Sequence, residues 1–85
     1  MKEFSYVVTD EMGIHARPAG ILVKQASGYK SKITLTAPKG TADLKRIMAV
    51  MRLAVKKGDE VKVTCEGEDE AKASEELEKF FKENL

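Results

Sequence analysis

Segments that alternate apolar and polar residues are interleaved with helical segments in an order that admits few folds. Alternation with the two-residue period of a half-buried strand occurs at Phe4 to Val8, Lys32 to Thr36 and Val61 to Cys65, with a short hairpin arm at Thr41 to Asp43. Helical patterns cover Ala16 to Ser27, Ile47 to Val55 and the residues after Gly67. The order βαββαβα has too few strands for a doubly wound parallel sheet, and it contains a hairpin. It predicts an α+β fold in which helices pack on one face of an antiparallel sheet.

The first helix has the clearest pattern. Pro18 fits its first turn and Gly28 can end it. Its apolar residues fall on one face, which is formed by Ala16, Ala19, Leu22, Val23 and Ala26. The last helix has acidic residues at its start and lysines near its end, as the helix dipole favours, and we expect it to bury Ala73, Leu77 and Phe80 or Phe81.

Length and charge limit the functions that the chain can have. Eighty-five residues support one core, so we expect a single domain over residues 1–85. The net charge of +1 lacks the basic surplus that non-specific binding of nucleic acid requires. No signal peptide and no stretch of about 18 apolar residues is found. We therefore expect a cytoplasmic protein that is not inserted in a membrane, and we expect it to be a monomer.

The scarcity of histidine and cysteine limits the chemistry. One histidine and one cysteine cannot form a metal site of these ligands, and no Gly-x-x-x-x-Gly-Lys-Ser/Thr loop for a nucleotide occurs. We expect no metal and no other cofactor. Cys65 lies on the inward side of a predicted strand, so we interpret it as a packing residue and not as a redox group.

The strongest candidate for chemistry is the segment Gly13 to Pro18, which holds the only histidine where the first helix begins. A helix N-terminus, here Ala16, Arg17 and Pro18, offers unpaired N–H groups and the positive end of the dipole. A phosphoryl group on His15 would lie over this helix end, and the Arg17 guanidinium suits phosphate oxygens. A lone histidine before a helix is more often a cap or an exposed residue. Its neighbours Gly13 and Arg17 favour a transient phosphohistidine instead.

Gly20 is unusual because glycine inside a helix costs about 1 kcal/mol relative to alanine. It lies on the helix face of Arg17 and Lys24, away from the apolar stripe. Two interpretations stay open. Gly20 is either a tolerated imperfection or a gap that lets a partner's surface approach His15.

The second helix has apolar residues on two sides, with Val50, Leu53 and Ala54 on one and Ile47, Met48 and Met51 on the other. All six could belong to the core. Alternatively, Ile47, Met48 and Met51 form an exposed docking patch of the adaptable, methionine-rich kind that binds several partners. Three cations, Lys24, Lys45 and Arg46, would then give this docking patch a basic rim that attracts acidic partners.

Two separated motifs carry a family resemblance. Gly13-Ile14-His15-Ala16-Arg17-Pro18-Ala19, followed by Ala42-Asp43-Leu44-Lys45 and Ile47-Met48-Ala49-Val50-Met51, resembles HPr, the histidine-containing phosphocarrier of the bacterial phosphoenolpyruvate-dependent sugar phosphotransferase system. The resemblance runs from end to end of the chain. It implies an open-faced β-sandwich, in which three helices cover one face of a four-stranded antiparallel sheet.

The resemblance also implies a route for the phosphoryl group. In that family, phosphoenolpyruvate phosphorylates enzyme I on a histidine, the group moves to the imidazole matching His15, and a sugar-specific IIA domain receives it. His15 would be first nucleophile and then leaving group, with Arg17 steadying the charge. Such a protein is a transient carrier within a transferase system and not itself an enzyme. Family partners dock on the surface that matches Arg17, Gly20, Lys24, Ile47, Met48 and Met51.

One position departs from the family pattern. Many members carry a regulatory serine just before the Ile-Met pair, where this chain has Arg46, so the regulatory serine is absent. Two other functions stay open. The chain could be a regulatory or nitrogen-related phosphotransfer paralogue that uses the same histidine, or a non-catalytic α+β binding module in which His15 is only a cap.

Overall fold

The strands and helices follow the expected order. The computed structural model describes all 85 residues. The strands are β1 (Lys2–Val7), β2 (Lys32–Ala37), β3 (Gly40–Asp43) and β4 (Glu60–Glu66), and the helices are α1 (Ala16–Ser27), α2 (Ile47–Arg52) and α3 (Glu70–Asn84). The strands form one antiparallel sheet in the order β1-β4-β2-β3. The predicted α+β fold, with a four-stranded antiparallel sheet and three helices, is confirmed.

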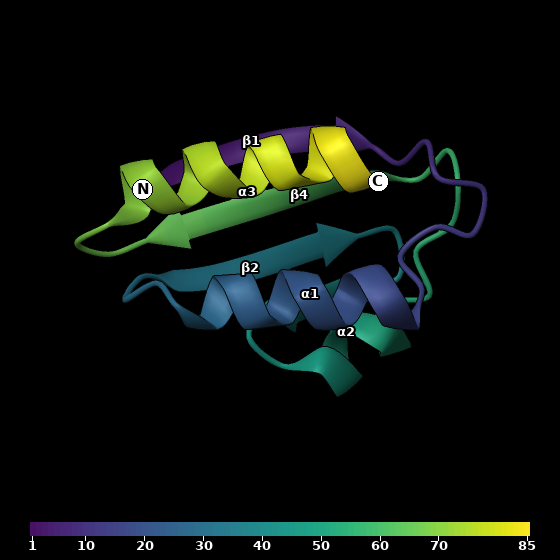
Figure 1. Ribbon diagram of the computed structural model, residues 1–85, viewed down its shortest axis with the longest axis horizontal. Coiled ribbons are helices and arrows are strands. Elements are labelled where there is room, and N and C mark those ends of the chain that lie inside the picture. Colours follow the sequence, from purple (N-terminus) through teal and green to yellow (C-terminus); the bar gives the residue numbers. More distant parts are fainter.

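The helices form a layer against the sheet (Figure 1). Helix α3 packs on β1 and β4, α2 lies next to β3, and α1 contacts both of the other helices. Alternate residues of the strands are buried beneath this layer, among them Phe4, Ile33, Leu35, Val61, Val63 and Cys65. The ring of Phe81 from α3 meets the rings of Phe4 and Tyr6 edge-on, with centroids 5.6 and 5.8 Å apart. None of the three helices combines the length and apolar character that crossing a bilayer requires.

Burial confirms most of the predicted inward positions. The thiol of Cys65 is fully buried, and burial raises its pKa, which confirms the packing interpretation. In α3 the residues Ala73, Leu77, Phe80 and Phe81 are all buried, as predicted. In α1, however, Ala16 is exposed and the buried stripe begins one turn later at Ala19.

Helix α2 is shorter than its apolar pattern predicts. It ends at Arg52 instead of Val55, because Ala54 has a left-handed backbone with φ of 47°. A residue in that conformation cannot continue a right-handed helix. The turn also removes Ala54 from the inward side of α2, so Ala54 is exposed while Val50 and Leu53 are buried.

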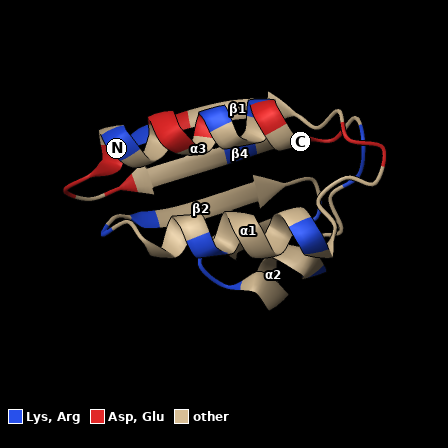
Figure 2. Cartoon of the chain, in the orientation of Figure 1, with Lys and Arg blue, Asp and Glu red and all other residues tan.

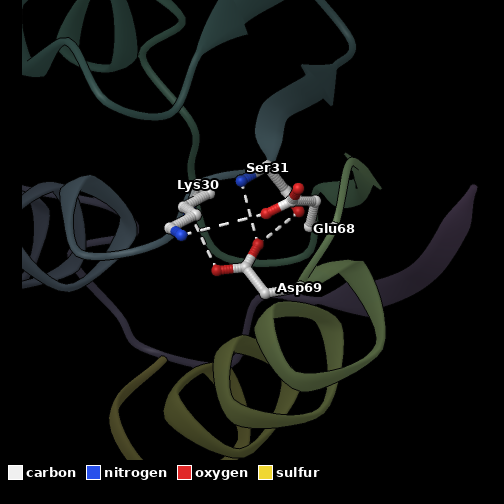
Figure 3. A network of polar contacts seen from close by, with 4 residues as sticks. All are labelled: Lys30, Ser31, Glu68 and Asp69. Carbon is white, nitrogen blue, oxygen red and sulfur yellow. Dashed lines mark hydrogen bonds and ion pairs between the residues drawn. The ribbon is translucent and has the colours of Figure 1, made fainter.

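The start of α3 is tied to the loop between α1 and β2 (Figure 3). The Asp69 carboxylate accepts hydrogen bonds from the N–H groups of Lys30 at 2.8 Å and Ser31 at 2.9 Å, and from the Ser31 hydroxyl. The bond from the Ser31 hydroxyl, followed by that from Lys30, lowers the pKa of Asp69 from 3.8 to about 2. Asp69 occupies the N-cap position of α3 but uses its carboxylate for this link and not for capping.

Candidate functional site

His15 occupies the N-cap position of α1 with an extended backbone. Its carbonyl accepts the first helical hydrogen bond, from the Ala19 N–H at 3.0 Å, while its imidazole makes no capping hydrogen bond. The N–H groups of Ala16 and Arg17 donate to no other group of the protein, and Pro18 has no N–H to donate. A capping histidine would satisfy such donors. Instead, a half-buried imidazole without a partner and two free donors share one helix end.

The two helices α1 and α2 carry only cationic charges, and the nearest carboxylate in the walls around His15 is that of Asp10, in the loop before α1. Helices α1 and α2 carry Arg17, Lys24 and Arg52 and no carboxylate, whereas α3 mixes both signs (Figure 2). Arg17 is exposed and takes part in none of the ion pairs of the structure. Its guanidinium can therefore turn to an anion at the helix N-terminus without first breaking a salt bridge.

A hollow of about 180 Å³ lies beside His15. The loop before α1, α1 itself and the end of α3 supply its walls, which are formed by Asp10, His15, Arg17, Pro18, Ile21, Phe80 and Asn84. Sequence reasoning missed Asp10, Ile21, Phe80 and Asn84. Of these four, only Asp10 has a local sequence signal, because aspartate is typical of turns. In the structure its carboxylate accepts the Met12 N–H at 2.8 Å. A larger hollow along α3 is lined only by glutamates and lysines of that helix and shares no residue with this one.

The loop that carries His15 rests on the segment that follows α2. The Ile14 N–H donates to the Val55 carbonyl at 3.1 Å, and both side chains are buried. Gly13 closes a turn by donating its N–H to the Asp10 carbonyl at 2.9 Å. Figure 1 shows these two loops side by side at one end of the sheet. The position of His15 is thus set by a contact between two distant parts of the chain.

The two sides of α2 differ in exposure. Val50 and Leu53 are buried, whereas Met48 is 65% exposed, Ile47 is 39% exposed and Met51 is half-buried. The six apolar residues on the two sides of this helical segment are therefore not all core. Gly20 of α1 faces Ile47, because a β-carbon added at Gly20 would lie 3.8 Å from the Ile47 Cδ1. The structure thus brings Gly20 and the predicted docking patch together on adjoining helices.

A family profile described as "PTS HPr component phosphorylation site" matches residues 2–83 of the chain. The chain belongs to the HPr family. It is 45% identical over 69 residues to the phosphocarrier protein HPr of Mycoplasma capricolum, covering 81% of this chain and 78% of that protein. It is 38% identical over 85 residues to HPr of Mycoplasma genitalium, covering 99% of this chain and 97% of that protein.

A solved structure supports the same assignment. The histidine-containing phosphocarrier protein of a mycoplasma matches with a TM-score of 0.91 at 39% identity, covering 93% of this chain and 90% of that chain. The HPr resemblance and the phosphocarrier role in the phosphotransferase system are confirmed at the level of the family. An α+β binding module of unrelated role is thereby excluded.

The cations around the predicted docking patch differ in their exposure and in the partners that they bind within the chain. Lys24 is exposed, whereas the Lys45 ammonium donates to the Tyr29 carbonyl at 2.7 Å and is held near the end of α1. Arg46 stands at the N-cap of α2 and forms an exposed ion pair with Asp43 at 3.8 Å. An exposed pair of this length contributes little. The cost of an exposed cation at a helix N-terminus is of the same small order.

Proposed function

We propose that this chain carries a phosphoryl group on His15, taken from phosphorylated enzyme I and given to sugar-specific IIA domains. The observation that supports this most directly is the state of His15. An imidazole without a hydrogen-bond partner shares the start of α1 with two free N–H groups and an unpaired Arg17 guanidinium. This is the arrangement that an anion attached to the ring would need.

The transfer requires only the exchange of one bond for another. The lone pair of an imidazole nitrogen of His15 attacks the phosphorus on the donor's phosphohistidine. The bond from phosphorus to the donor's nitrogen breaks, and its electron pair returns to that nitrogen. At the acceptor the same exchange runs with His15 as the leaving group. Arg17 and the N–H groups of Ala16 and Arg17 stabilise the phosphoryl charge throughout.

Partners are proposed to dock on the face that α1 and α2 form together. Ile47, Met48 and Met51 would supply the apolar centre, with Arg17, Gly20, Lys24 and Lys45 around it. The exposure of Met48 and the absence of carboxylates on both helices support this choice.

Incubation with enzyme I and labelled phosphoenolpyruvate tests the proposal. We expect one phosphoryl group per chain, labile in acid and stable in alkali as a phosphoramidate should be. Because His15 is the only histidine, His15→Ala should abolish the label. Label that survives His15→Ala would refute the mechanism. Arg17→Ala should slow transfer without abolishing it, since the N–H groups still hold part of the charge.

A second incubation separates the sugar pathway from the alternative of a nitrogen-related or regulatory chain. Phosphorylated protein is mixed in parallel with a sugar IIA domain and with a nitrogen-related IIA domain, and the loss of label from His15 is followed in time. Faster loss to the sugar IIA domain is expected. Faster loss to the other acceptor would move the protein to that chain.

A further inference from the structure

One main-chain hydrogen bond joins the loop that carries His15 to the segment that follows α2. The donor, the Ile14 N–H, is adjacent to His15, and the acceptor is the Val55 carbonyl at 3.1 Å. Ile14 and Val55 are 4% and 3% exposed, so water does not compete for this bond. The helix that holds the proposed docking patch ends only a few residues before Val55. This hydrogen bond therefore links the loop that carries His15 to the segment that follows the helix with the docking patch.

Gly13 allows the two segments to approach this closely. It has a φ of +67°, and a β-carbon at this position would overlap the Val55 carbonyl oxygen and lie 2.8 Å from the Lys56 Cα. These are main-chain atoms that cannot turn aside as the end of a flexible side chain can. The Val55 carbonyl thus occupies the space that any side chain at residue 13 would need.

Ala54 directs the Val55 carbonyl toward the His15 loop. Its left-handed φ of 47° is unusual for a residue with a β-carbon and is held by the surrounding structure. The Ala54 N–H donates to the Met51 carbonyl and the Leu53 N–H to the Val50 carbonyl, each at 3.1 Å. These bonds end α2 in a tight turn, and the following residue is Val55.

We infer that the Val55 carbonyl and Gly13 position His15 relative to the docking patch, so that a partner seated on α2 meets the imidazole in line for transfer. The inference rests on the function proposed above. Neither group contacts the phosphoryl group, so both are positioning residues that act through the loop. In-line transfer depends on such alignment, and a misplacement of about 1 Å can lower the rate about 100-fold.

Two glycine variants test this inference as a matched pair. Gly58 also has a left-handed backbone, with φ of +90°, but a β-carbon there would meet nothing within 4 Å. Gly13→Ala and Gly58→Ala therefore share the backbone strain, and only Gly13→Ala displaces the Val55 carbonyl. The measurements are kcat and KM for phosphorylation by enzyme I, and the NMR signals of the single imidazole.

Gly13→Ala should lower kcat at least about tenfold while KM stays within about twofold, and it should shift the imidazole signals. Gly58→Ala should leave kcat, KM and the imidazole signals unchanged. Equal losses of kcat in the two variants, or a folded Gly13→Ala with unaltered kcat, would overturn the inference. If both variants have lower melting temperatures and Gly13→Ala shows no fall in kcat beyond that of Gly58→Ala, the effect is purely structural and the inference is wrong.

A chemical variant decides the matter if Gly13→Ala does not fold. Replacing the amide between Gly13 and Ile14 with an ester removes the Ile14 N–H and adds no bulk, and the same fall in kcat is expected. An unchanged kcat in this ester variant would again overturn the inference. If the unaltered chain takes no phosphoryl group from enzyme I, the proposed function fails. The imidazole signals still test positioning, and signals unchanged in a folded Gly13→Ala, or in the ester variant, would refute it.

Discussion

Gly20→Ala should stabilise the protein. Gly20 lies inside α1, where replacing glycine with alanine gains about 1 kcal/mol. The new β-carbon would lie 3.8 Å from the Ile47 Cδ1, which is an ordinary van der Waals distance, and it meets no other atom within 4 Å. No steric cost is therefore subtracted. For a chain of this size a gain of about 1 kcal/mol raises the melting temperature by about 4–8 °C.

Thermal and urea unfolding measure this gain, with Gly28→Ala at the C-cap of α1 as the control. A β-carbon at Gly28 would lie 3.3 Å from the Gln25 carbonyl oxygen, so the gain there should be smaller. A melting temperature of Gly20→Ala at or below that of the unaltered protein would refute the reasoning. The KM for enzyme I then decides between the two interpretations of Gly20. A raised KM shows that the missing side chain serves partner approach, and an unchanged KM shows a tolerated imperfection.

Three further predictions concern the surface and the fold. Met48→Glu should raise the KM for enzyme I. Because the side chain is 65% exposed, the free energy of unfolding should change by no more than about 0.5 kcal/mol. Unfolding of this variant would show that Met48 belongs to the core. Asp69→Asn should destabilise the protein near neutral pH. Folding lowers the pKa of Asp69 from 3.8 to about 2, so the difference in free energy of unfolding between the two proteins should shrink as the pH falls from about 4 to about 2. Urea unfolding at stepped pH measures this difference, and a difference that stays constant down to about pH 2 would contradict the prediction. Finally, ATP and a bifunctional HPr kinase should leave no acid-stable phosphate on the unaltered protein, whereas Arg46→Ser should create a site. Acid-stable phosphate mapped between Thr41 and Arg52 of the unaltered protein would show a switch that has moved.

The sequence predicts an element well when all of its signals lie within that element. Helix α1 has its predicted bounds because Pro18, Gly28 and the apolar stripe are local features. Helix α2 ends early for a reason that has no local signal. Apolar residues continue through Val55, whereas the helix ends at the left-handed Ala54, and the carbonyl of the next residue, Val55, accepts a hydrogen bond from Ile14 of the distant His15 loop.

The candidate site divides in the same way. The six residues from Gly13 to Pro18 contain the imidazole, the helix end and the guanidinium, so this part could be predicted. The hollow beside His15 is completed by Phe80 and Asn84 of α3, and the loop is supported by Val55. These residues lie far from His15 in the sequence, and periodicity within a single element carries no information about such contacts.

The place of β4 in the sheet determines when the sheet can form. It pairs with β1 on one side, from Lys2 with Cys65 to Val7 with Glu60, and with β2 on the other. During synthesis β2 and β3 can pair with each other at once, but β1 has no partner until β4 has left the ribosome. Non-local pairing of this kind makes folding slow, because the entropy cost of closing a long loop comes before the stabilising contacts between the strands form. Lys2 and Glu3 at the start of β1 are exposed, and charged side chains on an unpaired strand disfavour its pairing with other chains.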